Sequence, residues 1–128
     1  MSEQAARSDE AAAQGQGEHR NLVFLVGRLS GPAEERTLPS GDRVAVWRLV
    51  VERPGGGPSA RRAGRVDTID CVAWQGPMRR RVQRWAAGDT IEVEGALRRR
   101  FWRSAGGGVS SRYEVEAAAL RRVARASP

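Results

Sequence analysis

The sequence predicts an all-β barrel of five strands, with one helix between the third and fourth strands. Two observations favour this class. Five segments show the two-residue alternation or the short apolar run of a strand, and stretches rich in glycine and proline separate them. One segment instead repeats its apolar residues at helical spacing. A chain of 128 residues is long enough to bury one modest core among such elements.

The first strand begins where bulky apolar side chains first become frequent. Residues 1–20 contain almost none and are predicted to form a disordered tail. The apolar run from Leu22 to Val26 then indicates a buried strand. This strand continues to Leu29, with a bend or bulge at Gly27.

The second strand follows a predicted loop and a turn. Residues 30–35 are expected to form the loop, and residues 38–42 combine the proline and glycine of a tight turn. Arg43 to Val51 alternate as a strand, with Trp47 on the core face. Residues 53–65 then hold two prolines, four glycines and four arginines, which is the composition of a long mobile loop.

The third strand, Val66 to Trp74, leads into the helix. Pro77 suits the first turn of a helix because its missing N–H is not needed there. Apolar residues from Met78 to Trp85 recur on one face, and Gly88 is expected to close the helix as a C-terminal cap.

The last two strands are predicted to form a hairpin. The fourth runs from Thr90 to about Trp102, the fifth runs from Ser110 to about Ala118, and glycines 106–108 form the tip. A five-stranded barrel with a helix after its third strand is the OB-fold arrangement, whose sheet face and loops bind oligonucleotides. The OB-fold domain is predicted to span residues 21–120, with 121–128 as a short C-terminal tail.

The charge of the chain points to a polyanionic partner, with nucleic acid first and an anionic membrane second. The net charge is +7, although the first twenty residues hold two arginines against four acidic residues. The rest of the chain therefore carries a surplus of nine positive charges. All 22 basic residues are arginine, which offers a planar fork for phosphate. The alternative explanation of this composition is a GC-rich coding sequence.

Several function classes are excluded by the residues that the chain lacks. The single cysteine, Cys71, cannot form an internal disulfide, which fits a reducing cytoplasm. The sole histidine lies in the N-terminal tail, and Asp67 and Asp70 point to opposite faces of a strand. No enzymatic activity, cofactor or metal site is therefore expected. No apolar run reaches the ~18 residues of a membrane span, so we expect a cytoplasmic, nucleoid-associated protein without a membrane partner.

The fourth strand carries the candidate nucleic-acid site. Alternation from Ile91 to Leu97 defines its core face, and the same parity places Arg98, Arg100 and Trp102 together on the open face. Guanidiniums pair with phosphates and an indole stacks on bases. Arg99 falls at core parity, which leaves a bulge or an early exit from the barrel open. The alternative is a solvated strand end whose tryptophan packs against its hairpin partner.

Further arginines are added to the site from the strand end and from the mobile loop. A glycine-rich loop can close over a flexible strand, at a cost in ordering entropy. The residues predicted to bind nucleic acid are Arg53, Arg61, Arg62, Arg65, Arg98, Arg100, Trp102 and Arg103.

Several separated motifs resemble, in the correct order, the bacterial single-stranded DNA-binding proteins (the SSB family). They are Asn21-Leu-Val-Phe-Leu-Val-Gly-Arg-Leu29, Glu35-Arg-Thr-Leu-Pro-Ser-Gly41, Val44-Ala45, Cys71-Val-Ala-Trp74, Gly88-Asp89, Ile91 through Trp102, and Arg112-Tyr113. The resemblance covers about residues 21–120, and the arginine-only composition is similar to that of an actinobacterial member.

The resemblance implies an OB fold that binds and protects single-stranded DNA without sequence preference in replication, recombination or repair. It also implies self-association into a homotetramer, or else a dimer. Trp102 matches a base-stacking tryptophan of the family, and Arg98 and Arg100 match phosphate-facing basic positions beside it.

The sequence departs from the family pattern at several aromatic positions. Arg53 begins the segment where members often place a second tryptophan, Ile69 stands where another can occur, and Gln75 stands where a phenylalanine can occur. We expect the protein to lack the acidic C-terminal end of the family, and so we do not expect it to recruit replication or repair proteins through such a tail. The missing aromatics favour an alternative function, an OB-fold protein-interaction module of a replication or primosome assembly. RNA binding is a third option.

Overall fold

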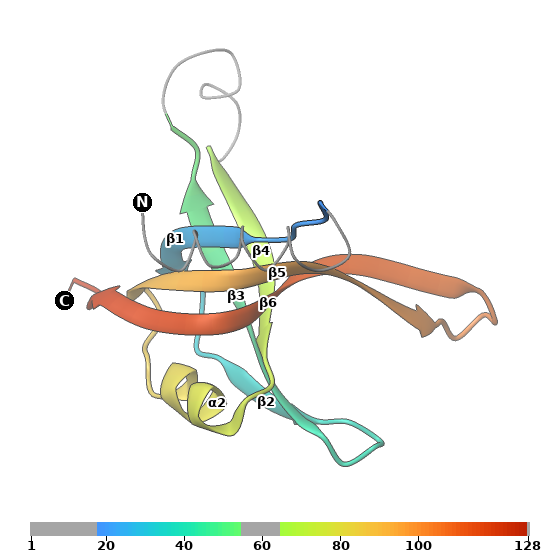
Figure 1. Cartoon of the computed structure of the whole chain (residues 1–128). Coiled ribbons are helices and arrows are strands. Elements are labelled where there is room, and N and C mark those ends of the chain that lie inside the picture. Colours follow the sequence, from blue (N-terminus) through green and yellow to red (C-terminus); the bar gives the residue numbers. More distant parts are fainter. Residues whose placement is uncertain (1–17, 55–64, 128) are drawn as a thin grey trace.

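The computed structural model describes residues 18–54 and 65–127, in which five long strands close into a barrel (Figure 1). The single helix of the described residues lies between the third and fourth long strands. The predicted fold class is therefore confirmed. The elements are β1 (Val23–Leu29), β2 (Glu34–Thr37), β3 (Arg43–Glu52), β4 (Val66–Ala73), α2 (Gly76–Gln83), β5 (Thr90–Arg103) and β6 (Val109–Ala124).

The sheet follows the order β1-β5-β6-β4-β3-β2, and a pairing between β1 and β3 closes the barrel. The strands pair antiparallel except for β4 and β6, which run parallel from Cys71 opposite Val115. At the closure, β1 and β3 approach closely beside Gly27, where an added Cβ would collide with the backbone carbonyl of Val50. A glycine is therefore required at this close approach, although the pairing of β1 with β5 continues in register through Gly27 and shows no bulge there.

The core is built from the inward positions of the alternating strands and from the helix. Leu29, Leu49 and Ile91 are fully buried, and the cluster includes Trp47 and Trp85 as the sequence predicts. Burial of these apolar side chains is the main favourable contribution to folding.

Cys71 also packs in this core. Burial raises the pKa of its thiol to about 12, because a thiolate is poorly solvated there and lies near the negative charges of Asp70 and Glu114. Its thiol is therefore a packing group rather than a nucleophile.

The helix is shorter than predicted because α2 ends at Gln83 and Gly88 lies four residues beyond its C-cap. Gly88 instead adopts a positive φ of 90° in the connection to β5 and donates a hydrogen bond to the carbonyl of Leu29. Two helix arginines hold α2 against its neighbours. Arg79 donates to the carbonyl of Trp74 and pairs with Glu35, and Arg81 donates to the carbonyl of Leu120.

Strand β2 lies partly in the segment that was expected to be a loop. It pairs with β3 from Glu34 opposite Val46 to Thr37 opposite Arg43, and all four of its side chains are exposed. Because β2 buries no apolar side chain, its sequence lacks the alternation by which a strand is recognised.

Strand β6 continues to Ala124, well beyond the predicted end near Ala118. The first residues of the predicted C-terminal tail therefore belong to the barrel. Arg121 forms an ion pair with Glu92, which lies opposite it on β5, and Arg122 lies 3.5 Å from the carboxylate of Asp89. One of these carboxylates lies on β5 and the other lies just before it, and each gives an arginine of β6 a partner.

Candidate nucleic-acid interface

The β5–β6 hairpin extends well past the barrel (Figure 1). Its two faces carry different residues. Residues directly opposite on two antiparallel strands point to the same side of the sheet. Arg100 lies opposite Arg112, and Trp102 lies opposite Ser110. We call this side the Trp102 face. Its members are Arg98, Arg100 and Trp102 of β5 with Ser110, Arg112 and the buried Glu114 of β6.

The Trp102 face forms one wall of a hollow. This hollow has a volume of about 230 Å³ and is lined by Arg36 of β2 together with Arg100, Trp102 and Arg112. Trp102 is 43% exposed, so part of its side chain is accessible to a ligand. Three guanidiniums beside an accessible indole suit a ligand that carries both phosphates and flat rings.

The charges in this hollow are incompletely compensated. Arg100 and Arg112 are directly opposite each other, an arrangement that destabilises a sheet when the charges are alike. Arg112 Nε lies 3.8 Å from Oε1 of the buried Glu114, whereas Arg100 has no ion pair in the described part of the chain. An anion bound between the two guanidiniums would remove their repulsion.

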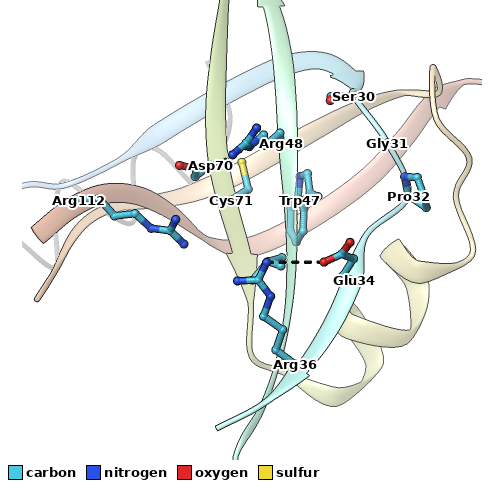
Figure 2. A pocket seen from close by; sticks show the side chains of 11 residues that line it. Ser30, Gly31, Pro32, Glu34, Arg36, Trp47, Arg48, Asp70, Cys71 and Arg112 are labelled. Atoms are coloured by element: carbon cyan, nitrogen blue, oxygen red, sulfur yellow. Dashed lines mark ion pairs between the residues drawn. The ribbon is translucent and has the colours of Figure 1, made fainter. Parts of the chain in front are cut away.

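A larger trough adjoins the hollow, since Arg36 and Arg112 line both. Figure 2 shows side chains that line this trough. It has a volume of about 330 Å³ and runs across β2, β3 and β4. Two arginines in it are paired with carboxylates. Arg48 Nε lies 3.4 Å from Asp70 Oδ1, and Arg36 Nη2 lies 3.6 Å from Glu34 Oε2. The residues that line it are Ser30, Gly31, Pro32, Glu34, Arg36, Val46, Trp47, Arg48, Asp70, Cys71 and Arg112.

Arg98 lies on the Trp102 face, where the alternation places it, but outside the hollow. Its Nε is 3.3 Å from Glu116 Oε1, in a surface ion pair whose arginine side chain is 55% exposed. Such pairs contribute only about 0–1 kcal/mol. Arg98 can therefore exchange this carboxylate for a phosphate at little cost.

The other predicted site residues are not brought to the hollow. Arg103 alternates with Trp102 and so belongs to the opposite face of the hairpin. Arg53 and Arg65 lie at the end of the β3–β4 ribbon, which projects in a different direction from the hairpin (Figure 1). Arg61 and Arg62 lie outside the described residues.

Arg53 already has a carboxylate partner at that end of the ribbon. It donates to Asp67 Oδ1 from Nη2 at 2.7 Å and from Nε at 3.1 Å. This hydrogen bonding lowers the pKa of Asp67 and raises the pKa of Arg53. A phosphate at Arg53 would have to compete with this partner.

Sequence reasoning missed three arginines that line the hollow and the trough. Arg48 lies between Trp47 and Leu49, so the alternation of β3 could have placed it on the open face. Arg112 could have been found by pairing the last two strands, which sets it opposite Arg100. Arg36 gives no such signal, because it lies on β2, a strand without an apolar face.

Two further features bear on the chemistry of the chain. Within the described ranges, no three histidine, cysteine, aspartate or glutamate side chains gather as they would around a metal ion. No helix in the same ranges has the length and apolar character needed to cross a bilayer.

The fold and the arginine-lined surface define an OB barrel of the kind that binds oligonucleotides. The description "Single-strand binding protein family" belongs to the family model that matches residues 20–123. Because the match spans most of the chain, the protein belongs to this family of non-enzymatic DNA-binding proteins. The resemblance noted in the sequence is thereby confirmed at the level of the family.

Solved structures support the same fold. The fold matches 191 chains of known structure. Among them is the Plasmodium falciparum SSB in complex with ssDNA, with a TM-score of 0.65 and 18% sequence identity. The match covers 84% of this chain and 98% of that one. No curated protein sequence matches the chain significantly.

Proposed function

We propose that the protein binds single-stranded DNA without sequence preference through the hollow and the adjoining trough. The observation that carries this proposal is the meeting of three guanidiniums and an exposed indole in one hollow, from three different strands. Bases stack on Trp102, and phosphates lie between Arg36, Arg100 and Arg112. Membership of the single-strand binding family supports this, as does the likeness to a structure described as an SSB complex with ssDNA.

The chemistry of the hollow explains why sequence preference is not expected. Arginine–phosphate contacts position a strand but read no base. An indole accepts every base, because each base has a flat π-face. None of the residues lining the hollow presents a neutral hydrogen-bonding amide of the kind that distinguishes one base edge from another.

The binding energy is expected to come more from phosphates than from stacking. Ile69 is partly buried against the core, and neither Ile69 nor Gln75 carries an aromatic ring on which a base could stack. The trough supplies arginines instead. A binder of this kind loses affinity steeply as salt rises, because each phosphate contact releases counterions.

We also propose that the chain associates with further copies of itself, as a homotetramer or a dimer. The outer side of β1 and its approach expose Leu22 (55%), Phe24 (58%) and Val26 (43%) in a row. Neighbouring apolar side chains exposed on the outside of a barrel indicate an interface. The mass of the full chain in solution, measured on the protein used for binding, tests this assembly. A monomeric mass would contradict it.

Substitution of Trp102 by alanine tests the stacking site. Because base stacking contributes about 1–3 kcal/mol per base, Trp102→Ala should weaken oligo-dT binding roughly 5- to 150-fold. Fluorescence titrations at two salt concentrations measure the effect. Trp102→Phe is the matched control, since it keeps an aromatic ring and should bind within a few fold of the wild type. Equal affinities of the wild type and Trp102→Ala would remove the proposed site.

The same titrations with oligo-rU compare DNA with RNA. Absence of oligonucleotide binding at low salt, with retention of a protein partner, would instead favour the protein-interaction module considered from the sequence.

A further inference from the structure

The side of the hairpin opposite Trp102 carries a second group of exposed rings. Arg99 lies opposite Tyr113, and Phe101 lies opposite Ser111, so these four residues share one side. We call this side the Phe101 face. Its members are Leu97, Arg99, Phe101 and Arg103 of β5 with Val109, Ser111 and Tyr113 of β6.

The Phe101 face continues the inward side of the barrel but is not covered. Phe101 is 60% exposed, Tyr113 is 58% exposed and Leu97 is 43% exposed. Farther along β5, Ile91 and Val93 have the same parity and are fully buried. Large apolar side chains gathered on an open surface indicate a binding site more often than chance exposure does.

Arg99 lies over both rings of this face. Its guanidinium carbon lies 5.0 Å from the centroid of Phe101 and 5.4 Å from that of Tyr113, which is cation–π distance. Nε and Nη2 also donate to Ser111 Oγ at 3.3 and 3.1 Å. The guanidinium and the two rings together form a preorganised platform, and guanidinium planes and aromatic rings are the surfaces on which unpaired bases stack.

The charge of the Phe101 face distinguishes its ligand. The Trp102 face has carboxylates close by, since Arg98 pairs with Glu116 and Arg112 lies near Glu114. The Phe101 face has two arginines and no acidic member, and Arg99 has no ion pair among the described residues. An uncompensated cationic face with flat rings complements a polyanion that carries flat rings.

A second copy of the chain is a poorer occupant of this face. A two-fold contact would place the same patch of each copy against the other. Such an interface would gather the Arg99 and Arg103 side chains of both copies, and the face supplies no carboxylate to pair with them.

We infer that the Phe101 face is a second stacking platform for the same single strand, reached when the strand passes around the edge of the hairpin from the Trp102 face. This inference rests on the proposed function. Bases stack on Phe101, Tyr113 and the plane of Arg99, and Arg103 contacts a phosphate. A long single strand then wraps around the hairpin and contacts both of its faces.

The test compares a short strand, which fills one face, with a long strand, which reaches both. Oligo-dT of about 4 and about 16 nucleotides spans the range that OB folds bind. The double variant Phe101→Ala/Tyr113→Ala should bind the short strand as the wild type does, and should bind the long strand roughly 5- to 150-fold more weakly. The conservative variant Phe101→Tyr/Tyr113→Phe keeps both rings and should restore the affinity for the long strand. Circular dichroism melts of each variant confirm that it is folded.

The possible failures are distinguishable. Trp102→Ala should weaken both strands, and if it weakens neither, the proposed function fails. If Trp102→Ala weakens both strands while the double variant binds the long strand normally, the second platform is overturned and the proposed function stands. Equal weakening of both strands by the double variant also overturns a separate platform. A change in solution mass with unchanged binding would assign the Phe101 face to a contact between copies, which likewise overturns it.

Discussion

The two halves of β5 follow one alternating pattern, but side chains of the same parity are buried in one half and exposed in the other. In the barrel half, Thr90–Gly95, the inward side chains of Ile91 and Val93 are completely buried. In the hairpin half, Leu97–Arg103, Phe101 has the same parity and is 60% exposed. The strand is continuous, and its parity with respect to β6 is kept through the hairpin half.

This difference in exposure follows from the elements that surround each half of β5. Pairing of β1 with β5 ends at Val23 opposite Gly95. Just beyond it, the side-chain amide of Asn21 donates to the carbonyl of Leu97 at 2.7 Å and accepts from its N–H at 2.8 Å. Beyond these two hydrogen bonds, β5 pairs only with β6. The same pattern therefore builds a core where other elements lie over it and a binding surface where they do not.

The largest effect is expected for a substitution at the end of the barrel half. An added Cβ at Gly95 would collide with the backbone carbonyl of Glu116 on β6, and backbone cannot move aside as a side chain can. Gly95→Ala should therefore lower the free energy of unfolding by about 3 kcal/mol, the upper end of overpacking costs. Urea denaturation measures the loss.

The matched control is Gly106→Ala at the tip of the hairpin half, where nothing lies within 4 Å of an added Cβ. Its free energy of unfolding should stay within about 0.5 kcal/mol of the wild type. Equal stabilities of the two variants would erase the contrast between the packed and the uncovered half.

A smaller effect is expected on the salt dependence of DNA binding. If Arg100 contacts one phosphate, Arg100→Gln should reduce the slope of log Kobs against log salt by about 0.7 for a single strand. Titrations of oligo-dT over a series of salt concentrations measure the slope. Arg125→Gln removes the same charge just beyond the opposite end of β6, in an exposed position, and should leave the slope unchanged. An equal reduction in both variants would mean that net charge, rather than the hairpin half, sets the slope.

The smallest effect is expected on the pH dependence of stability, through Asp89, which immediately precedes β5. Asp89 accepts hydrogen bonds from the backbone N–H of Ala86 at 3.0 Å and of Ala126 at 2.8 Å, and these bonds hold its pKa below the ordinary value of 3.8. Because its folded pKa is lowered, this carboxylate stabilises the fold above pH 3.8, and the contribution is lost as pH falls through the folded pKa.

Asp89→Asn should therefore be less stable than the wild type at neutral pH, and the difference should narrow below about pH 4. Chemical denaturation of both proteins over a pH series checks this. DNA binding at neutral pH should not change, because Asp89 lies at the far end of β5 from the hairpin. A stability difference that is constant with pH would show that the carboxylate charge is not what matters.

The sequence by itself determined the long strands, the position of the helix and the parity of the site. Alternation along β5 was sufficient to place Arg98, Arg100 and Trp102 on one side, because side chains on a strand must alternate. The same rule placed Trp47 in the core. These are local properties, which each segment carries without reference to the rest of the chain.

Only the tertiary structure decided which parts of the two faces of β5 are covered by other elements and which remain exposed. The alternation of β5 assigns Arg99 and Phe101 to the core, and it contains no signal that the pairing with β1 stops at Val23. Arg36 enters the site from a strand that buries nothing, so no periodicity reveals it. Exposure depends on contacts between distant segments, and a pattern within one segment cannot encode where its neighbours stop.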